Sequence, residues 1–129
     1  KITVLIATMV LWVGVANAQA QTRIFNVDSE HFKKAMDSLS GEIIIDLRTP
    51  DELKEGKIAG AAVIDFFGAN FEPAIKGLDK SKTYFLYCAG GGRSSETAEL
   101  MKELGFNTIY NLEEGFNGWK KKGLPVEKR

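Results

Sequence analysis

Apolar residues along this chain follow two patterns in turn, which indicates alternating strands and helices. Uninterrupted apolar runs at 42–46 (EIIID) and 83–87 (TYFLY) are typical of strands buried on both faces of a parallel sheet. After a possible cap at Asp28 or Ser29, apolar residues recur at helical spacing up to Gly41. They are Phe32, Ala35, Met36 and Leu39.

The remaining segments continue this alternation. Shorter strand candidates lie at 23–27, 60–65 and 108–112, and a helix over 94–105 carries an apolar face between the last two strands. Further helices are expected after Pro50, within 66–78 and around Trp119. The sequence therefore predicts one α/β domain over residues 23–129, with central strands that are mostly parallel.

Residues 1–20 differ from the rest of the chain. Lys1 precedes an apolar run over 2–16, and small residues then alternate through 16–20, which is the layout of a secretory signal peptide. The run is shorter than the ~20 residues that span a bilayer. We expect an exported protein, periplasmic or secreted, that is not inserted in the membrane after cleavage. An uncleaved N-terminal anchor is the alternative.

Charge and cysteine content narrow the classes of function. Seventeen basic residues balance seventeen acidic ones, and 44% of the residues are hydrophobic, as in ordinary globular proteins. No basic patch suggests a nucleic acid as partner. The single cysteine, Cys88, has no disulfide partner within the chain, so in an oxidising compartment it is either buried and inert or free and reactive.

The surroundings of Cys88 favour reactivity. Cys88 follows the apolar strand at 83–87, three glycines come after it, and a helix begins near Arg93. In a parallel sheet this is the edge that binds ligands, and a glycine turn before a helix gathers backbone amides around an anion. These amides and Arg93 would favour the thiolate. In the alternative interpretation Cys88 is a small core residue beside a tight turn.

Three motifs carry a resemblance to a known family. CAGGGRS (88–94) resembles the C-x-x-G-x-R-S loop of the rhodanese-like sulfurtransferases, and IIIDLRTPDELKEGKIAGAAVID (43–65) and EEGFNGWKKKGLPVE (113–127) resemble two further signatures of that family. The resemblance implies an α/β rhodanese-like fold, with a five-stranded sheet flanked by helices on both faces. It also implies that Cys88 takes a sulfane sulfur from a donor such as thiosulfate and passes it, as a persulfide, to cyanide or a thiol.

The resemblance also assigns residue roles. Cys88 would be the nucleophile, and Arg93 would attract an anionic donor. Asp46 and Arg48 would support the loop, although an ion pair between Arg48 and Glu52 is an equal alternative. The expected substrate-binding residues, whose backbone amides would surround the persulfide, are Ala89, Gly90, Gly91, Gly92, Arg93 and Ser94.

Two residues depart from the family motifs. Lys57 stands where the family often has histidine, and Phe116 replaces the second glycine of the C-terminal signature. We expect Lys57 on the surface of a loop and expect neither residue to touch the catalytic loop. Phe116 could still alter the backbone near the last helix.

Other activities remain as alternatives. A related phosphatase or arsenate reductase would carry H-C-x-x-x-x-x-R, but here Tyr87 precedes the cysteine and only four residues separate Cys88 from Arg93. His31 is expected on a helix surface, which argues against a Cys-His hydrolase. No metal ligands cluster and no cofactor is expected. A persulfide carrier that delivers sulfur to a partner protein fits the sequence as well as an enzyme does.

Overall fold

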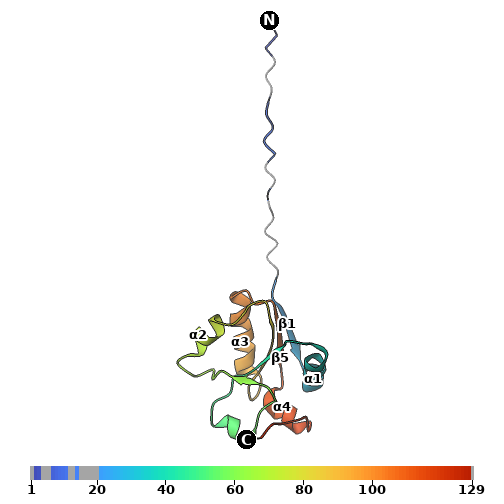
Figure 1. Cartoon of the computed structure of the whole chain (residues 1–129), viewed down its shortest axis with the longest axis vertical. Helices are drawn as coiled ribbons and strands as arrows, with labels where there is room; N and C mark the ends of the chain where they lie inside the picture. Colours follow the sequence, from blue (N-terminus) through green and yellow to red (C-terminus); the bar gives the residue numbers. More distant parts are fainter. Residues whose placement is uncertain (1, 4–6, 12–13, 15–20, 129) are drawn as a thin grey trace.

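The computed structural model describes residues 2–3, 7–11, 14 and 21–128 (Figure 1). The predicted signal peptide, residues 1–20, therefore lies largely outside the described residues. Within the described ranges, no helix has both the length and the apolar character needed to cross a membrane.

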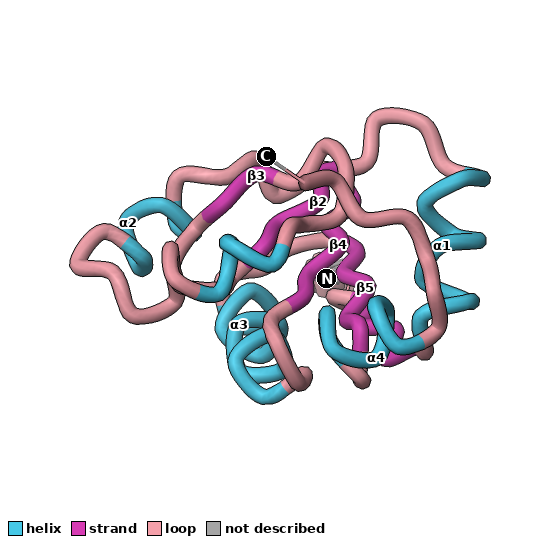
Figure 2. Tube along the Cα trace, turned by 90° about the horizontal axis from the view of Figure 1, so that it is seen from below, coloured by secondary structure: helices cyan, strands magenta, loops and turns pink. Residues whose placement is uncertain are grey.

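Five parallel strands form the centre of the domain. Their order in the sheet is β1-β5-β4-β2-β3, so β4 lies in the middle (Figure 2). All pairings are parallel, which confirms the predicted α/β class. The strand predicted over 60–65 is shorter than expected and keeps two residues. The strand bounds are β1 Arg23–Val27, β2 Ile43–Asp46, β3 Ala62–Val63, β4 Thr83–Tyr87 and β5 Thr108–Leu112.

Helices cover both faces of this sheet, as predicted. Helices α2 and α3 lie on one side, and α1 and α4 lie on the other (Figure 1). A short 3-10 helix, η1, follows β2. The helix bounds are α1 Ser29–Ser38, η1 Glu52–Glu55, α2 Phe71–Lys76, α3 Gly92–Glu103 and α4 Gly115–Lys121.

Strand β4 separates two hydrophobic cores. Tyr84, Leu86 and Cys88 pack in the core beneath α2 and α3. Phe85 and Tyr87 point the other way, into the core beneath α1 and α4. Successive side chains of a strand face opposite sides, so an uninterrupted apolar run is what a strand between two cores requires.

The first helix is shorter than predicted. The spacing of apolar residues extends it through Leu39 to Gly41, but α1 ends at Ser38 and Leu39 is 40% exposed. Its backbone is extended (φ −103°, ψ 144°), so its side chain leaves the helical register that Phe32 follows into the core.

A buried ion pair stands at the carboxyl end of β2. The Arg48 guanidinium donates to Asp46 from Nε (2.9 Å) and Nη2 (2.7 Å), and both side chains are essentially inaccessible to solvent. The Tyr87 hydroxyl donates to Asp46 Oδ2 at 2.6 Å and accepts from the amide of Ile58 at 3.0 Å. Arg48 also donates to the carbonyl of Gly56 at 2.7 Å. The network therefore joins β2 to β4 and to the loop after η1.

Removing the Tyr87 hydroxyl should destabilise the domain. Tyr87→Phe leaves a buried amide at Ile58 and a buried carboxylate at Asp46 each short of a partner, which costs about 1–3 kcal/mol for each group. The free energy of unfolding from urea titration measures the loss. Tyr84→Phe is the matched control, because its hydroxyl donates only to the carbonyl of Asp79, and a loss of about 1 kcal/mol is expected there. Equal losses in both variants would contradict a special role for the network.

Candidate active site

Cys88 stands directly after β4, at the carboxyl edge of the sheet. Its side chain is 1% exposed and belongs to the core beneath α2 and α3. The loop that follows turns at once into α3, which begins at Gly92. As predicted, the thiol lies between the end of the central strand and the N-terminus of a helix, where backbone amides converge.

The sulfur atom makes hydrogen bonds within this loop. The amide of Gly91 donates to Cys88 Sγ at 3.1 Å, and the Cys88 thiol donates to Ser94 Oγ at 3.5 Å. Burial raises the pKa of the Cys88 thiol, but its hydrogen bonds with the Ser94 hydroxyl and the loop amides lower that pKa by more. The net effect holds that pKa below its ordinary value. The Cys88 thiol, although buried, therefore ionises more readily than an ordinary cysteine.

Only the middle glycine of the three is required by the backbone. Gly91 has φ +100°, and a side chain there would collide with the carbonyl of Glu113. Gly90 and Gly92 both face open space and have ordinary φ values. The sequence pattern therefore overstated how many glycines the loop needs.

The start of α4 is hydrogen-bonded to the backbone of the loop that contains Cys88. The amide of Phe116 donates to the carbonyl of Cys88 at 2.8 Å, and the amide of Asn117 donates to that of Ala89 at 3.1 Å. Gly115, at φ +62°, lies so close to the carbonyl of Ala89 that a side chain could not fit. The expectation that Phe116 does not touch the loop is wrong. A backbone hydrogen bond carries this contact, and residue type alone does not reveal it.

The ring of Phe116 reaches the buried ion pair as well. The Arg48 guanidinium lies 4.0 Å from the centroid of this ring, a cation-π contact. Arg48 and Asp46 therefore touch Tyr87 and Phe116, the neighbours of Cys88 in sequence and in space, rather than the sulfur itself. This placement is compatible with the supporting role that the family resemblance implied.

Arg93 is engaged by a carboxylate. Its Nη1 and Nη2 donate to Glu52 Oε1 and Oε2 at 2.7 and 2.8 Å, a two-pronged ion pair. Hydrogen bonds from Arg93 hold the pKa of Glu52 far down, at about 2. The alternative ion pair between Arg48 and Glu52 is absent. Arg48 donates a hydrogen bond to the backbone carbonyl of Glu52, at 3.2 Å, and not to its carboxylate. Sequence reasoning missed Glu52 as a site residue, although it occupies the glutamate position of the D-x-R-x-x-x-E signature.

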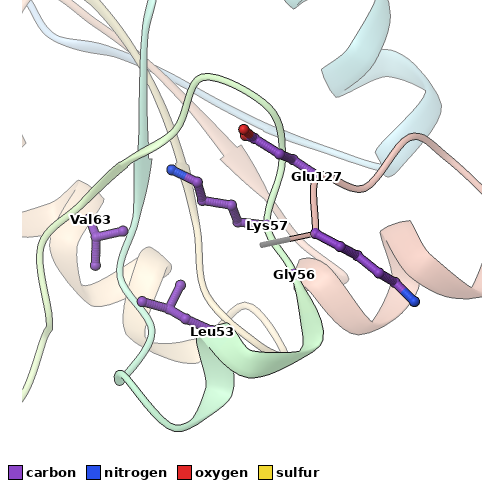
Figure 3. A pocket seen from close by; sticks show the side chains of 6 residues that line it. Leu53, Gly56, Lys57, Val63 and Glu127 are labelled. Atoms are coloured by element: carbon purple, nitrogen blue, oxygen red, sulfur yellow. The ribbon is translucent and has the colours of Figure 1, made fainter.

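Lys57 lies apart from the thiol. Its backbone pairs with Glu127, its amine donates to the carbonyl of Ala61 at 2.9 Å, and its side chain is half-buried rather than fully on the surface. It borders a small cavity of about 80 Å³ between η1, β3 and the C-terminal segment (Figure 3). The side chains of Leu53 and Val63 face Lys57 across this cavity.

Metal-binding clusters and the single histidine were the remaining candidates for chemistry. Among the described residues, no cluster of histidine, cysteine, aspartate and glutamate could hold a metal ion. His31 is exposed at the start of α1, where its ring contacts the capping residue Asp28 at 2.7 Å.

In this parallel α/β sheet the central strand ends at a cysteine whose sulfur accepts a hydrogen bond from a loop amide, an arrangement suited to thiolate chemistry. Residues 28–122 match the family described as the Rhodanese-like domain, and the chain belongs to that family. A relative named "Sulfurtransferase" from Allochromatium vinosum is 25% identical over 78% of this chain and 92% of its own length. The chain is thus a rhodanese-family sulfurtransferase.

Solved structures agree with this assignment. A rhodanese-related protein from Thermoplasma volcanium matches with a TM-score of 0.70 and 27% identity, over 81% of this chain and 99% of that one. The polysulfide-sulfur transferase homodimer of Wolinella succinogenes matches with a TM-score of 0.68 and 30% identity, over 82% and 80% of the two chains. These likenesses confirm the predicted rhodanese fold.

A side chain at Gly91 should disable the loop. Gly91→Ala forces the loop away from the carbonyl of Glu113 and moves the amide that donates to Cys88 Sγ, so alkylation of Cys88 by iodoacetamide should slow at least about tenfold. Gly90→Ala is the matched control, because its new methyl group meets open space. Equal rates in the two variants would show that the geometry at Gly91 does not matter.

The Ser94 hydroxyl should help to set the pH at which Cys88 reacts. Removing it takes away a hydrogen bond that lowers the Cys88 pKa, so in Ser94→Ala the midpoint of the rate of iodoacetamide alkylation against pH should move to higher pH. Ser95→Ala is the control, because both hydroxyl groups donate to the carbonyl of Gly91 and only that of Ser94 is also hydrogen-bonded to Cys88 Sγ. A midpoint that stays in place in Ser94→Ala contradicts this role for the hydroxyl.

Proposed function

We propose that this protein transfers a sulfane sulfur from a donor such as thiosulfate to a thiophilic acceptor through a persulfide on Cys88. The observation that carries the proposal is the hydrogen bond that Cys88 Sγ receives from the Gly91 amide, together with its hydrogen bond to the Ser94 hydroxyl, because these contacts lower the thiol pKa. A thiolate at neutral pH is the nucleophile that such a reaction needs.

The proposed reaction has two displacement steps. The Cys88 thiolate attacks the outer sulfur of thiosulfate, a sulfur–sulfur bond forms on the protein, and the sulfur–sulfur bond of the donor breaks to release sulfite. The electron pair of the broken bond leaves with sulfite, so the protein keeps one negative charge on the persulfide. Cyanide then attacks the outer sulfur of the persulfide, which gives thiocyanate and restores the thiolate. A thiolate acceptor would take the same sulfur as its own persulfide.

The loop can stabilise the negative charge both on the Cys88 thiolate and on the terminal sulfur of the persulfide, which lies one bond further out. The amide of Gly91 and the N-terminus of α3 surround the sulfur in the resting site, and the same donors would stabilise the terminal sulfur of the persulfide. Because four residues separate Cys88 from Arg93, the ring is one residue shorter than the phosphatase-type loop. Loop length therefore supports sulfur chemistry over phosphate or arsenate chemistry.

Polysulfide is a second candidate donor. The Wolinella succinogenes relative, which is 30% identical to this chain, is named for the transfer of polysulfide sulfur. Either donor leads to the same persulfide, and a protein that holds this persulfide for delivery to a partner would share the first step. The number of turnovers separates an enzyme from such a carrier.

Replacing Cys88 should abolish transfer without unfolding the domain. A serine hydroxyl at its ordinary pKa is a far weaker nucleophile, so Cys88→Ser should lower thiocyanate production from thiosulfate and cyanide by at least about a thousandfold. Circular dichroism verifies the fold of the variant. Wild-type rates in Cys88→Ser, or hydrolysis of an aryl phosphate by the wild-type protein, would overturn the proposal. A single turnover without further thiocyanate would point to the carrier.

A further inference from the structure

The positive charge nearest the catalytic loop is already paired. Arg93 offers two guanidinium nitrogens to the two carboxylate oxygens of Glu52, at 2.7 and 2.8 Å. Both side chains keep some solvent exposure, 19% for Arg93 and 32% for Glu52. The pair therefore lies at the protein surface beside the loop and not in the core with Cys88, and it meets an incoming ligand in its paired form.

Glu52 is fixed in this position by its own neighbours. Its Oε1 accepts from the amide of Thr49 at 3.0 Å and from the Thr49 hydroxyl at 3.1 Å. Its backbone carbonyl accepts from Arg48, which belongs to the buried ion pair with Asp46. Because the carboxylate is held by groups other than Arg93, it cannot simply swing away when an anion approaches.

The rest of the guanidinium is also surrounded. The ring of Phe67, which is 70% exposed, lies 5.5 Å from the Arg93 guanidinium carbon. Hydrogen bonds from Arg93 to Glu52 raise the pKa of Arg93, and the negative charges of Glu52, Cys88 and Asp65 act in the same direction. The Arg93 charge is thus already balanced by the Glu52 carboxylate at hydrogen-bond distance. Such a rim offers no net attraction to a doubly charged donor.

We propose that Glu52 determines donor specificity by cancelling the charge of Arg93, so that the site disfavours dianionic donors and prefers sulfane sulfur donors with fewer negative charges. This inference rests on the proposed function, since it concerns which donor delivers sulfur to Cys88. It differs from the expectation that Arg93 attracts an anionic donor. Thiosulfate, a dianion, would gain no net attraction from the neutralised Arg93 and would be repelled by the reacting thiolate, whereas a monoanionic thiosulfonate would meet half of that repulsion.

Charge removal at Glu52 tests the inference. Glu52→Gln frees the Arg93 charge, while the amide oxygen of glutamine can still accept from Thr49. The KM for thiosulfate should fall about fivefold to tenfold, and the KM for benzenethiosulfonate only about twofold to threefold, because the effect scales with donor charge. In both donors the transferred sulfur leaves behind an anion, sulfite or benzenesulfinate, so the chemistry is matched.

Two further variants serve as controls. Glu55→Gln removes the same charge from the same short helix, where Glu55 pairs with Lys120 at 2.8 Å instead of Arg93, and it should leave the ratio of the two KM values unchanged. Glu52→Asp keeps the charge and should retain the wild-type ratio. Thermal unfolding of each variant checks the fold. A Glu52→Gln variant that loses kcat equally for both donors, at an unchanged KM ratio, would make Glu52 a structural residue and overturn the inference.

An alkylation measurement keeps this test independent of sulfur transfer. Iodoacetate is anionic and iodoacetamide is neutral, and both alkylate the same thiolate with loss of iodide. Glu52→Gln should raise the ratio of their rates at Cys88 about threefold to fivefold, and Glu55→Gln should not. If this ratio shifts while the wild-type protein transfers no sulfur from either donor, the proposed function fails and the charge inference stands. An unchanged ratio, or a thiol that neither reagent labels, would overturn the inference.

Discussion

The backbone contact between the loop after Cys88 and the start of α4 is the constraint on which the site depends. Two carbonyl groups of the loop accept hydrogen bonds from two successive amides of α4, and Gly115 lets the two backbones approach. Held in this way, the loop turns the Gly91 amide back toward the sulfur. A lowered thiol pKa in a buried position follows from this geometry, because hydrogen bonds to the sulfur more than offset the cost of burial.

Two ion pairs of different kinds meet beside this loop, and Glu52 connects them. Its carbonyl accepts from Arg48 of the buried pair, and its carboxylate binds Arg93 in a second, partly exposed pair. A buried pair is a poor source of net stability, because desolvation offsets most of the attraction between its charges. The role of the buried pair is instead to fix the positions of the end of β2, of Tyr87 in β4 and of the turn that carries Glu52. The partly exposed pair in turn sets the charge near the thiol.

Much of the fold was predictable because local patterns record burial. The apolar runs of β2 and β4 correspond to strands between two cores, and the glycine-rich segment after Cys88 corresponds to a loop that leads into a helix. Leu39 was placed wrongly because periodicity does not show where a helix ends.

The features of the site that the sequence did not predict depend on contacts between segments that are distant along the chain. Glu52 and Arg93 stand 41 positions apart, and several arginines compete for the same carboxylate when only the sequence is considered. Only the folded arrangement shows that Arg48 is satisfied by Asp46, which leaves Glu52 for Arg93. The contact from Phe116 to Cys88 was hidden for a related reason, since it runs through backbone atoms. The need for glycine at Gly91 likewise comes from the carbonyl of Glu113, on another segment.

The central claim is that Cys88 carries a sulfane sulfur as a covalent persulfide. The most direct measurement is the intact mass of the reduced protein before and after thiosulfate, with the modified residue located by peptide mapping. The account predicts a gain of roughly 32 Da, one sulfur atom, on the peptide that contains Cys88, and loss of that mass when cyanide is added. A protein that keeps its original mass in thiosulfate and in polysulfide, although its thiol still reacts with iodoacetamide, would contradict the account.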